Sequence, residues 1–193
     1  MSELYPLAHL AVPGAGRPVG TTSAITLAER RPGSIAEFAF WDSETPIPKS
    51  FVPGSQPEPN RAVMAPGHVF LSIAPGRYMA IGQETGLSER LEAEIPIDDG
   101  TVVDLTHGRA GLRITGGPAA DLLQKGLSFD LAIGAFPPMA ATNAGLHHMS
   151  VTVIRLDAET FDVFVMTSLA GSLWDWATDA AVEYGWQVAA PVT

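Results

Sequence analysis

Cysteine is absent from this 193-residue chain, which excludes disulfides, thiolate nucleophiles, zinc sites ligated by cysteine and iron–sulfur clusters. Positive charge is scarce, because 11 lysines and arginines stand against 21 aspartates and glutamates, giving a formal net charge of −10. Nucleic-acid phosphates would repel such a surface unless basic residues gathered in one patch. Arg30 and Arg31 are the only adjacent basic pair, so we expect no nucleic-acid partner.

Long apolar runs are also missing. No window approaches the roughly 20 apolar residues of a membrane helix. The first residues, Met-Ser-Glu-Leu-Tyr-Pro, lack the basic start and the apolar core of a secretory signal. We therefore expect a cytoplasmic protein with no membrane partner. Hydrophobic residues make up 46% of the chain and charged residues 17%, a composition that can fill a core and excludes intrinsic disorder.

Proline is concentrated near the start of the chain. Ten of the 16 prolines lie between Pro6 and Pro66, most densely in residues 46–66. Each proline removes a backbone donor and favours an extended conformation before it. Residues 46–66 are therefore either a surface loop or an arm that lies along a partner protein. We expect residues 1–66 to form an extended, Pro-rich N-terminal arm with early strands.

The remainder shows a recurring order of strand, strand and helix. Short turn segments separate apolar runs that predict hairpins, and proline or glycine bounds the predicted helices. This order predicts an α+β fold of two similar antiparallel-sheet halves with helices on one face. Residues 67–100 form the first unit and residues 101–193 the second half, with 67–193 as one compact domain. The predicted strands are residues 69–73, 78–81, 102–105, 111–115, 150–156 and 161–166, and the helices are residues 87–94, 118–125 and 168–184.

The last predicted helix carries two tryptophans that cannot share one core. Its apolar spacing predicts that Trp176 faces the sheet, together with Leu169, Leu173, Ala180 and Tyr184. Trp174 would then point about 200° away around the helix. It lies either on its own surface, under a loop, or in a subunit contact. We expect four aromatic residues to be candidates for partner contact: Trp41, Phe51, Phe136 and Trp174.

Motifs that could bind a nucleotide or an anion are weak in this sequence. The glycines at 14, 16 and 20 resemble a dinucleotide loop, but no strand precedes them and Pro18 stands where the helix should begin. Gly116 and Gly117 precede a helix N-terminus that could accept an anion. A tight turn from strand to helix is the more common explanation for two such glycines, and we favour it.

Residues that could perform catalysis are present but do not form a recognisable set. His147 and His148 are adjacent, so in a strand their rings point to opposite faces and do not converge on a metal. Asp104 and His107 could pair near Arg109, but no nucleophile accompanies them, which favours a structural hydrogen-bond cluster. The acidic residues of the 150–166 hairpin fit turn and solvent-facing positions: Asp157, Glu159 and Asp162. We therefore assign no catalytic, cofactor-binding or metal-binding residue.

One long run has a recognisable pattern. Residues 103–126 read VDLTHGRAGLRITGGPAADLLQKG, and residues 130–131, 135–138, 161–165 and 168–176 continue the match, with residues 5–10 and 25–31 fitting its opening segments. This pattern resembles the gamma subunit of heterotetrameric sarcosine oxidase. The 103–126 run is similar, more distantly, to the folate-binding domain of glycine-cleavage T-protein, although the T-protein's folate-handling carboxylate has no matching residue here.

The resemblance implies a non-catalytic subunit. Enzymes of this family oxidatively demethylate N-methyl amino acids such as sarcosine and pass the one-carbon unit to tetrahydrofolate. The implied partners are larger alpha and beta subunits and a small delta subunit. FAD, FMN, NAD, tetrahydrofolate and zinc would be carried by those subunits, and this chain would bind no cofactor.

Three alternatives stay open at this point. The chain could serve a related dehydrogenase complex acting on another N-methyl amino acid, such as N-methylglutamate. It could be a stand-alone folate-binding or methyl-transfer protein with a T-protein-like fold. It could also be a structural homo-oligomer that associates through Trp174 and the Pro-rich arm.

Overall fold

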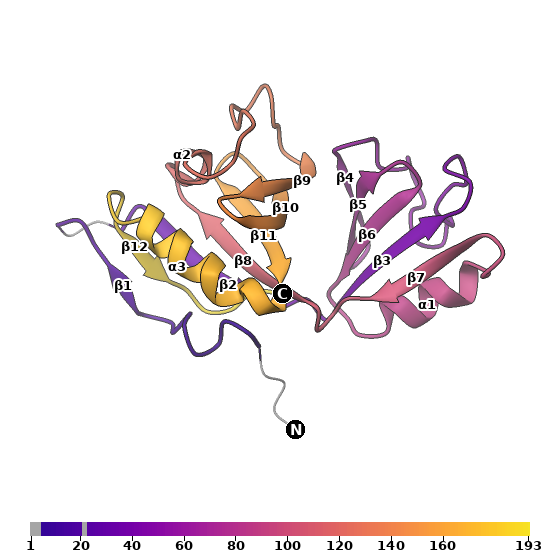
Figure 1. Ribbon diagram of the computed structural model, residues 1–193, viewed down its shortest axis with the longest axis horizontal. Helices are drawn as coiled ribbons and strands as arrows, with labels where there is room; N and C mark the ends of the chain where they lie inside the picture. Colours follow the sequence, from indigo (N-terminus) through magenta and orange to yellow (C-terminus); the bar gives the residue numbers. More distant parts are fainter. Residues whose placement is uncertain (1–4, 21–22) are drawn as a thin grey trace. The chain divides into compact units, whose positions relative to one another are not determined.

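The computed structural model describes residues 5–20 and 23–193 and divides the chain into two compact units (Figure 1). Unit 1 comprises the described residues up to Arg31, together with Arg109–Pro138 and Asn143–Val192. Unit 2 comprises Pro32–Gly108, Met139–Thr142 and Thr193. Most of unit 2 is thus inserted between two segments of unit 1. In the described part of the chain, no helix has the length and apolar character needed to span a bilayer.

Unit 2 is built on a five-stranded antiparallel sheet in the order β4-β5-β6-β3-β7. The predicted hairpin over residues 69–81 is confirmed as β5 and β6, and the predicted helix is confirmed as α1. The N–H of Ile95 closes the last turn of α1 on Leu91, and Pro96 prevents a further turn. The elements are β3 (Ser34–Phe40), β4 (Ala62–Ala65), β5 (His68–Ala74), β6 (Arg77–Gly82), α1 (Leu87–Glu94) and β7 (Gly100–Asp104).

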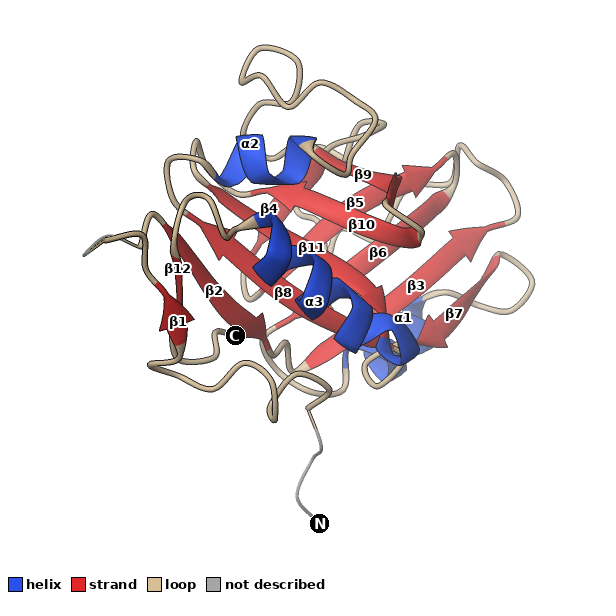
Figure 2. Ribbon diagram, turned by 60° about the vertical axis from the view of Figure 1, so that its left-hand side comes forward, coloured by secondary structure: helices blue, strands red, loops and turns tan. Residues whose placement is uncertain are grey.

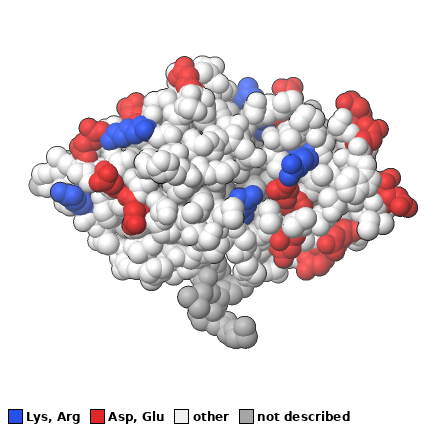
Figure 3. Space-filling view, in the orientation of Figure 1, with Lys and Arg blue, Asp and Glu red and all other residues white. Residues whose placement is uncertain are grey.

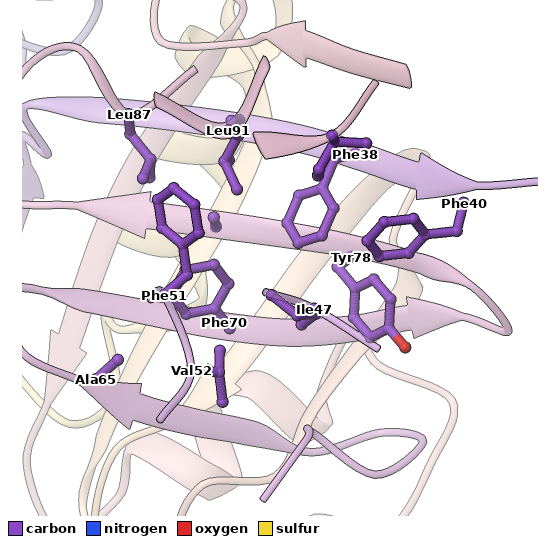
Figure 4. Close-up of a cluster of buried hydrophobic side chains, with 13 residues drawn as sticks. Phe38, Phe40, Ile47, Phe51, Val52, Ala65, Phe70, Tyr78, Leu87 and Leu91 are labelled. Carbon is purple, nitrogen blue, oxygen red and sulfur yellow. The ribbon is translucent and has the colours of Figure 1, made fainter. Parts of the chain in front are cut away.

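An aromatic cluster forms the core of unit 2 (Figure 4). The ring of Phe38, on β3, stacks on Tyr78 with centroids 5.3 Å apart and meets Phe40 and Phe70 edge-on at 6.0 and 6.3 Å. These offset and edge geometries are the favoured arrangements of aromatic pairs. Leu87 and Leu91 of α1 are buried in the same cluster. Phe38 therefore lies in the core between the central strands of the sheet and helix α1.

The Pro-rich segment does not form an extended arm. Residues 5–31 belong to unit 1, and residues 46–61 fold onto unit 2, where Ile47, Phe51 and Val52 are buried in the aromatic cluster. Gln56 holds this loop closed, since its side chain accepts a hydrogen bond from the N–H of Ile47 and donates one to the carbonyl oxygen of Ile47. The apolar anchors of the segment thus pack within its own chain.

Unit 1 is built on a seven-stranded mixed sheet in the order β1-β12-β2-β8-β11-β10-β9 (Figure 2). Its strands β12 and β2 are parallel. The prediction of antiparallel sheets is therefore wrong for this pair. The hairpin predicted over residues 150–166 is confirmed as β10 and β11. The elements are β1 (Gly16–Arg17), β2 (Ile25–Arg30), β8 (Arg109–Thr115), α2 (Ala119–Gln124), β9 (Ala141–Leu146), β10 (Met149–Arg155), β11 (Thr160–Met166), the 3₁₀ turn η1 (Thr167–Leu169), α3 (Ala170–Ala180) and β12 (Trp186–Val188).

The buried stripe of α3 differs from the predicted one. Trp174 is buried with Leu173 and Ala177, whereas Trp176 is half-buried. The indole of Trp174 meets Trp186 edge-on, with ring centroids 6.0 Å apart. The prediction chose the wrong tryptophan because two apolar spacings overlap on this helix, and a single periodic pattern cannot decide between them.

The observed fold is α+β with two sheets and few helices, but the units are divided differently from the expected 1–66, 67–100 and 101–193. Residues 100–104 and 109–115 do not form one strand pair. Instead β7 pairs with β3 in unit 2 and β8 pairs with β2 and β11 in unit 1. The boundary falls in the turn between β7 and β8 because their partners lie in different sheets.

Removing the Phe38 ring should destabilise unit 2. Phe38→Ala leaves a cavity between three other aromatic rings, and we expect a loss of about 3–5 kcal/mol of unfolding free energy. Met64→Ala is the control, because Met64 is exposed on β4 of the same sheet, and it should change stability by less than about 0.5 kcal/mol. Denaturant titration followed by circular dichroism measures both. Equal stability of the two variants would contradict the assigned core.

Candidate functional site

A buried ion cluster joins the three central strands of unit 1. Asp162 on β11 is 2% exposed, although the sequence placed it on a solvent-facing position. Its Oδ2 lies 2.9 Å from Arg30 Nε on β2 and 2.8 Å from Arg113 Nη2 on β8, and its Oδ1 lies 2.7 Å from Arg113 Nε. The sequence carried a signal for this burial, since Phe164 shares the strand face of Asp162 and is also buried.

This cluster is structural. Both oxygens of Asp162 accept hydrogen bonds from the two arginines, so the carboxylate is committed to an internal ion cluster. Its hydrogen bonds raise the pKa of Arg113 above the usual value, outweighing the burial that would lower it. The two arginines and one carboxylate hold β2, β8 and β11 in register and offer no reactive group.

The second buried carboxylate, Glu29, is also fully engaged. It accepts a hydrogen bond from the backbone N–H of Leu7 at 2.8 Å. Its other oxygen accepts from Nε and Nη2 of Arg31 at 2.7 and 2.5 Å. Glu29 therefore fastens the N-terminal segment of unit 1 to β2.

The predicted cluster around Asp104 is a turn. Asp104 Oδ1 accepts the N–H of Thr106 at 2.8 Å, and Thr106 Oγ1 accepts the N–H of Ile35 at 3.0 Å. Partial burial would raise the pKa of Asp104, but the hydrogen bonds from Thr106 and the charge of nearby His107 outweigh it and lower that pKa. These contacts shape the chain between β7 and β8, as the structural interpretation of this motif expects.

The adjacent histidines lie in a turn and not in a strand. His147 has a left-handed backbone with φ of 54°, and its ring meets that of His148 edge-on at a centroid distance of 4.0 Å. The two rings therefore contact each other, whereas the sequence placed them on opposite faces. Within the described residues, no group of three or more histidine, aspartate or glutamate side chains could hold a metal ion.

The glycine motifs are structural as well. Gly16 lies in β1, which pairs with β12, so the loop does not lead into a helix. Gly116 has φ of 139°, and a Cβ there would lie 2.0 Å from the carbonyl oxygen of Ala24. Only glycine fits this close approach, which supports the tight-turn interpretation.

Polar side chains line surface grooves on both units. One, of about 560 Å³, runs beside α3 and is lined by His147, His148, Asp175, Trp176 and Asp179. Another, of about 290 Å³, lies on unit 2 over His68, Arg90 and Glu94.

The polar groups of the unit 2 groove bind one another. The His68 ring donates from Nδ1 to the carbonyl oxygen of Pro66 at 2.8 Å and accepts at Nε2 from Arg90 at 2.6 Å, the only assignment these partners allow. Ser50 donates to Glu94 at 2.5 Å.

The four aromatic residues predicted to contact a partner differ in exposure. Phe51, Phe136 and Trp174 are buried within their own units, and the carbonyl of Phe136 accepts a hydrogen bond from Arg155. Trp41 is different, since it is 62% exposed. Its indole N–H donates to the carbonyl oxygen of Ile97 at 2.9 Å, and Ile97 is 83% exposed. Two exposed apolar residues of unit 2 are thus linked by a hydrogen bond from the indole of Trp41 to the backbone of Ile97.

Comparison with solved structures places the fold in a known class. The chain superposes on a chain of the heterotetrameric sarcosine oxidase from Corynebacterium sp. U-96 in complex with pyrrole 2-carboxylate, with a TM-score of 0.83, 22% identity and 100% coverage of both chains. It also resembles the glycine cleavage system aminomethyltransferase T from Bartonella henselae, with a TM-score of 0.61, 15% identity and coverage of 86% of this chain and 48% of that chain. The fold is thus that of the T-protein-like α+β proteins.

The particular family follows from the sequence comparisons. The model of the sarcosine oxidase gamma subunit family matches residues 43–183, and the chain belongs to this family. A curated relative, the sarcosine oxidase subunit gamma of Arthrobacter sp., is 28% identical over 121 residues. That alignment covers 62% of this chain and 60% of the relative's length.

Removing the negative charge of the ion cluster should destabilise unit 1. Asp162→Asn leaves Arg30 and Arg113 without a buried counter-charge, and breaking a buried pair in this way costs about 3–5 kcal/mol. Glu159→Gln removes one negative charge from the exposed turn of the same hairpin and should have almost no effect. Thermal unfolding at neutral pH compares the two variants. A similar melting temperature for both would show that the cluster contributes no stability.

Proposed function

We propose that this chain is the non-catalytic gamma subunit of a heterotetrameric sarcosine-oxidase-like complex. The complex oxidatively demethylates N-methyl amino acids and transfers the one-carbon unit to tetrahydrofolate. The observation that carries this proposal is the match of the gamma subunit family over residues 43–183. The full-length similarity in fold to a chain of such a heterotetramer supports it.

The role of the chain within the complex is structural. Its partners are the larger alpha and beta subunits and the small delta subunit, which carry FAD, FMN, NAD, tetrahydrofolate and zinc. The engagement of its buried carboxylates supports this role, because Asp162 and Glu29 are both occupied by arginines of the same unit. Trp41 supplies a contact with one of these subunits, since tryptophan is enriched at the energetic centres of protein interfaces.

Co-expression tests the proposal. When the tagged chain is produced with the alpha, beta and delta subunits, we expect all four to co-purify and the flavin absorbance to travel with the complex. The tagged chain produced alone should carry no flavin. Trp41→Ala should weaken assembly at least about tenfold, as expected for a hot-spot Trp, while Met64→Ala should leave it unchanged.

The outcomes also separate the alternatives. A stable monomer that retains none of the three subunits would contradict the proposal. Saturable binding of tetrahydrofolate to the isolated chain in a calorimetric titration would favour a stand-alone folate-binding protein. Turnover of N-methylglutamate in place of sarcosine by the purified complex would assign the chain to the related dehydrogenase complex.

A further inference from the structure

Strand β7 has one free hydrogen-bonding edge. It is the last strand of the unit 2 sheet and, among the strands that the structure describes, it pairs only with β3. The N–H of Leu105 donates to Ile35 and the N–H of Trp41 donates to Asp99, so the odd-numbered residues of β7 are bonded to β3. In an antiparallel pair the intervening residues direct their N–H and C=O groups outward. The N–H groups of Val102 and Asp104 and the C=O groups of Gly100, Val102 and Asp104 therefore point away from β3.

The opposite edge of the same sheet is treated differently. Residues 139–142 run beside β4, where the N–H of Ala62 donates to Met139 at 2.8 Å and the N–H of Ala141 donates to Asn60 at 3.0 Å. Within residues 5–20 and 23–193, no segment bonds to the outward groups of β7. In the described part of the chain, the β4 edge is thus bonded at its first residue, Ala62, whereas the outward groups of β7 have no bonded neighbour.

β7 has few of the devices that keep an open edge from pairing. Its sequence Gly-Thr-Val-Val-Asp contains no proline, lysine or bulge. Three consecutive β-branched residues give it a strong preference for an extended conformation. Val103 and Trp41 lie on the same face of the sheet, because both alternate away from Phe38 and Phe40, and both side chains are exposed. The open edge is therefore flanked by apolar side chains.

We propose that β7 pairs with an extended segment of one of the larger subunits, which adds a sixth strand to the sheet of unit 2. This inference rests on the proposed function, and it specifies how the chain binds its partner. Main-chain hydrogen bonds to Val102 and Asp104 supply the pairing, and apolar side chains of the added strand cover Trp41 and Val103.

Charge indicates the composition of the added strand. Asp98 and Asp99 precede β7 and Asp104 ends it, and all three are exposed. Arg77, on the same face, is already paired with Glu37. Acidic side chains gather on the part of unit 2 that carries α1 and β7 (Figure 3). A complementary strand therefore carries basic residues near its ends.

The same charges disfavour a second copy of this chain. An antiparallel β7–β7 pair would bring Asp104 of one copy beside Asp98 and Asp99 of the other. A parallel pair would align each aspartate with its equivalent. Either arrangement places like charges together at the rim, whereas a basic partner strand neutralises them.

Hydrogen exchange tests the inference directly in the assembled complex. In the isolated chain, the amides of Val102 and Asp104 should exchange rapidly, whereas those of Thr101 and Val103, bonded to β3, should be protected. In the complex with the larger subunits, the Val102 and Asp104 amides should slow by at least about tenfold. If the complex forms and these two amides still exchange rapidly, the inference fails and the proposed function stands. If no complex forms, both fail.

Two matched pairs of variants provide the second test. Val102→Pro and Val102→Ala lose the same side-chain packing, but only the proline removes the outward N–H, a position where an edge strand tolerates it. We expect Val102→Pro to bind the larger subunits at least tenfold more weakly than Val102→Ala. Asp99→Lys should weaken binding, whereas Glu58→Lys, at an exposed site before β4, should not.

Three results would overturn the inference. The first is equal binding by Val102→Pro and Val102→Ala. The second is unchanged binding by Asp99→Lys. The third is a dimer of the isolated chain, detected by light scattering, in which the Val102 and Asp104 amides are already protected. If Val102→Pro does not fold, the exchange measurement on the wild-type complex decides.

Discussion

Three side chains on neighbouring strands determine how this chain is divided. Asp162 on β11 binds Arg30 on β2 and Arg113 on β8, so residues separated by as many as 132 positions in sequence meet in one buried cluster. β8 lies between β2 and β11, and the segment between β2 and β8 forms a separate sheet. β7 immediately precedes β8 in sequence and ends that separate sheet as its outermost strand. The strand that follows β7 in sequence thus belongs to unit 1, and β7 remains at the open edge of the unit 2 sheet.

Several groups that could perform chemistry are engaged in holding the fold. Buried acids are neutralised by arginines, His68 bridges Pro66 and Arg90, and Asp104 organises a turn. Arg155 is used in the same way, since its guanidinium donates to the carbonyl oxygens of Leu131, Phe136 and Ala158, while its Nε donates to Asp157. Burial lowers the pKa of Arg155, although the charge of Asp157 opposes this effect. The exposed features, by contrast, are apolar side chains and a free strand edge, which suit binding to a protein.

Local structure could be predicted from the sequence, whereas long-range pairing could not. The hairpins over residues 69–81 and 150–166 and helix α1 depend on turn residues and periodicity within short windows. The partners of β7 and β8, and the burial of Asp162, depend on residues far away in sequence. The sequence pattern predicted that Trp176 faces the sheet, whereas the structure buries Trp174, because either residue fits an apolar stripe on this helix. Of the four aromatic residues predicted to contact a partner, only Trp41 exposes most of its side chain. The sequence alone does not show which of the four is exposed.

The insertion of unit 2 has a consequence for the order of assembly on the ribosome. β2 is among the first strands to be synthesised, but its neighbours β8 and β12 follow only after residues 32–108. Most of unit 2 is continuous in sequence and can pair its strands as they emerge, whereas the apolar side chains of β2 stay without a sheet until translation has passed residue 115. The early segment is therefore the part of the nascent chain most in need of protection from wrong partners, and the inserted unit is the first that can fold.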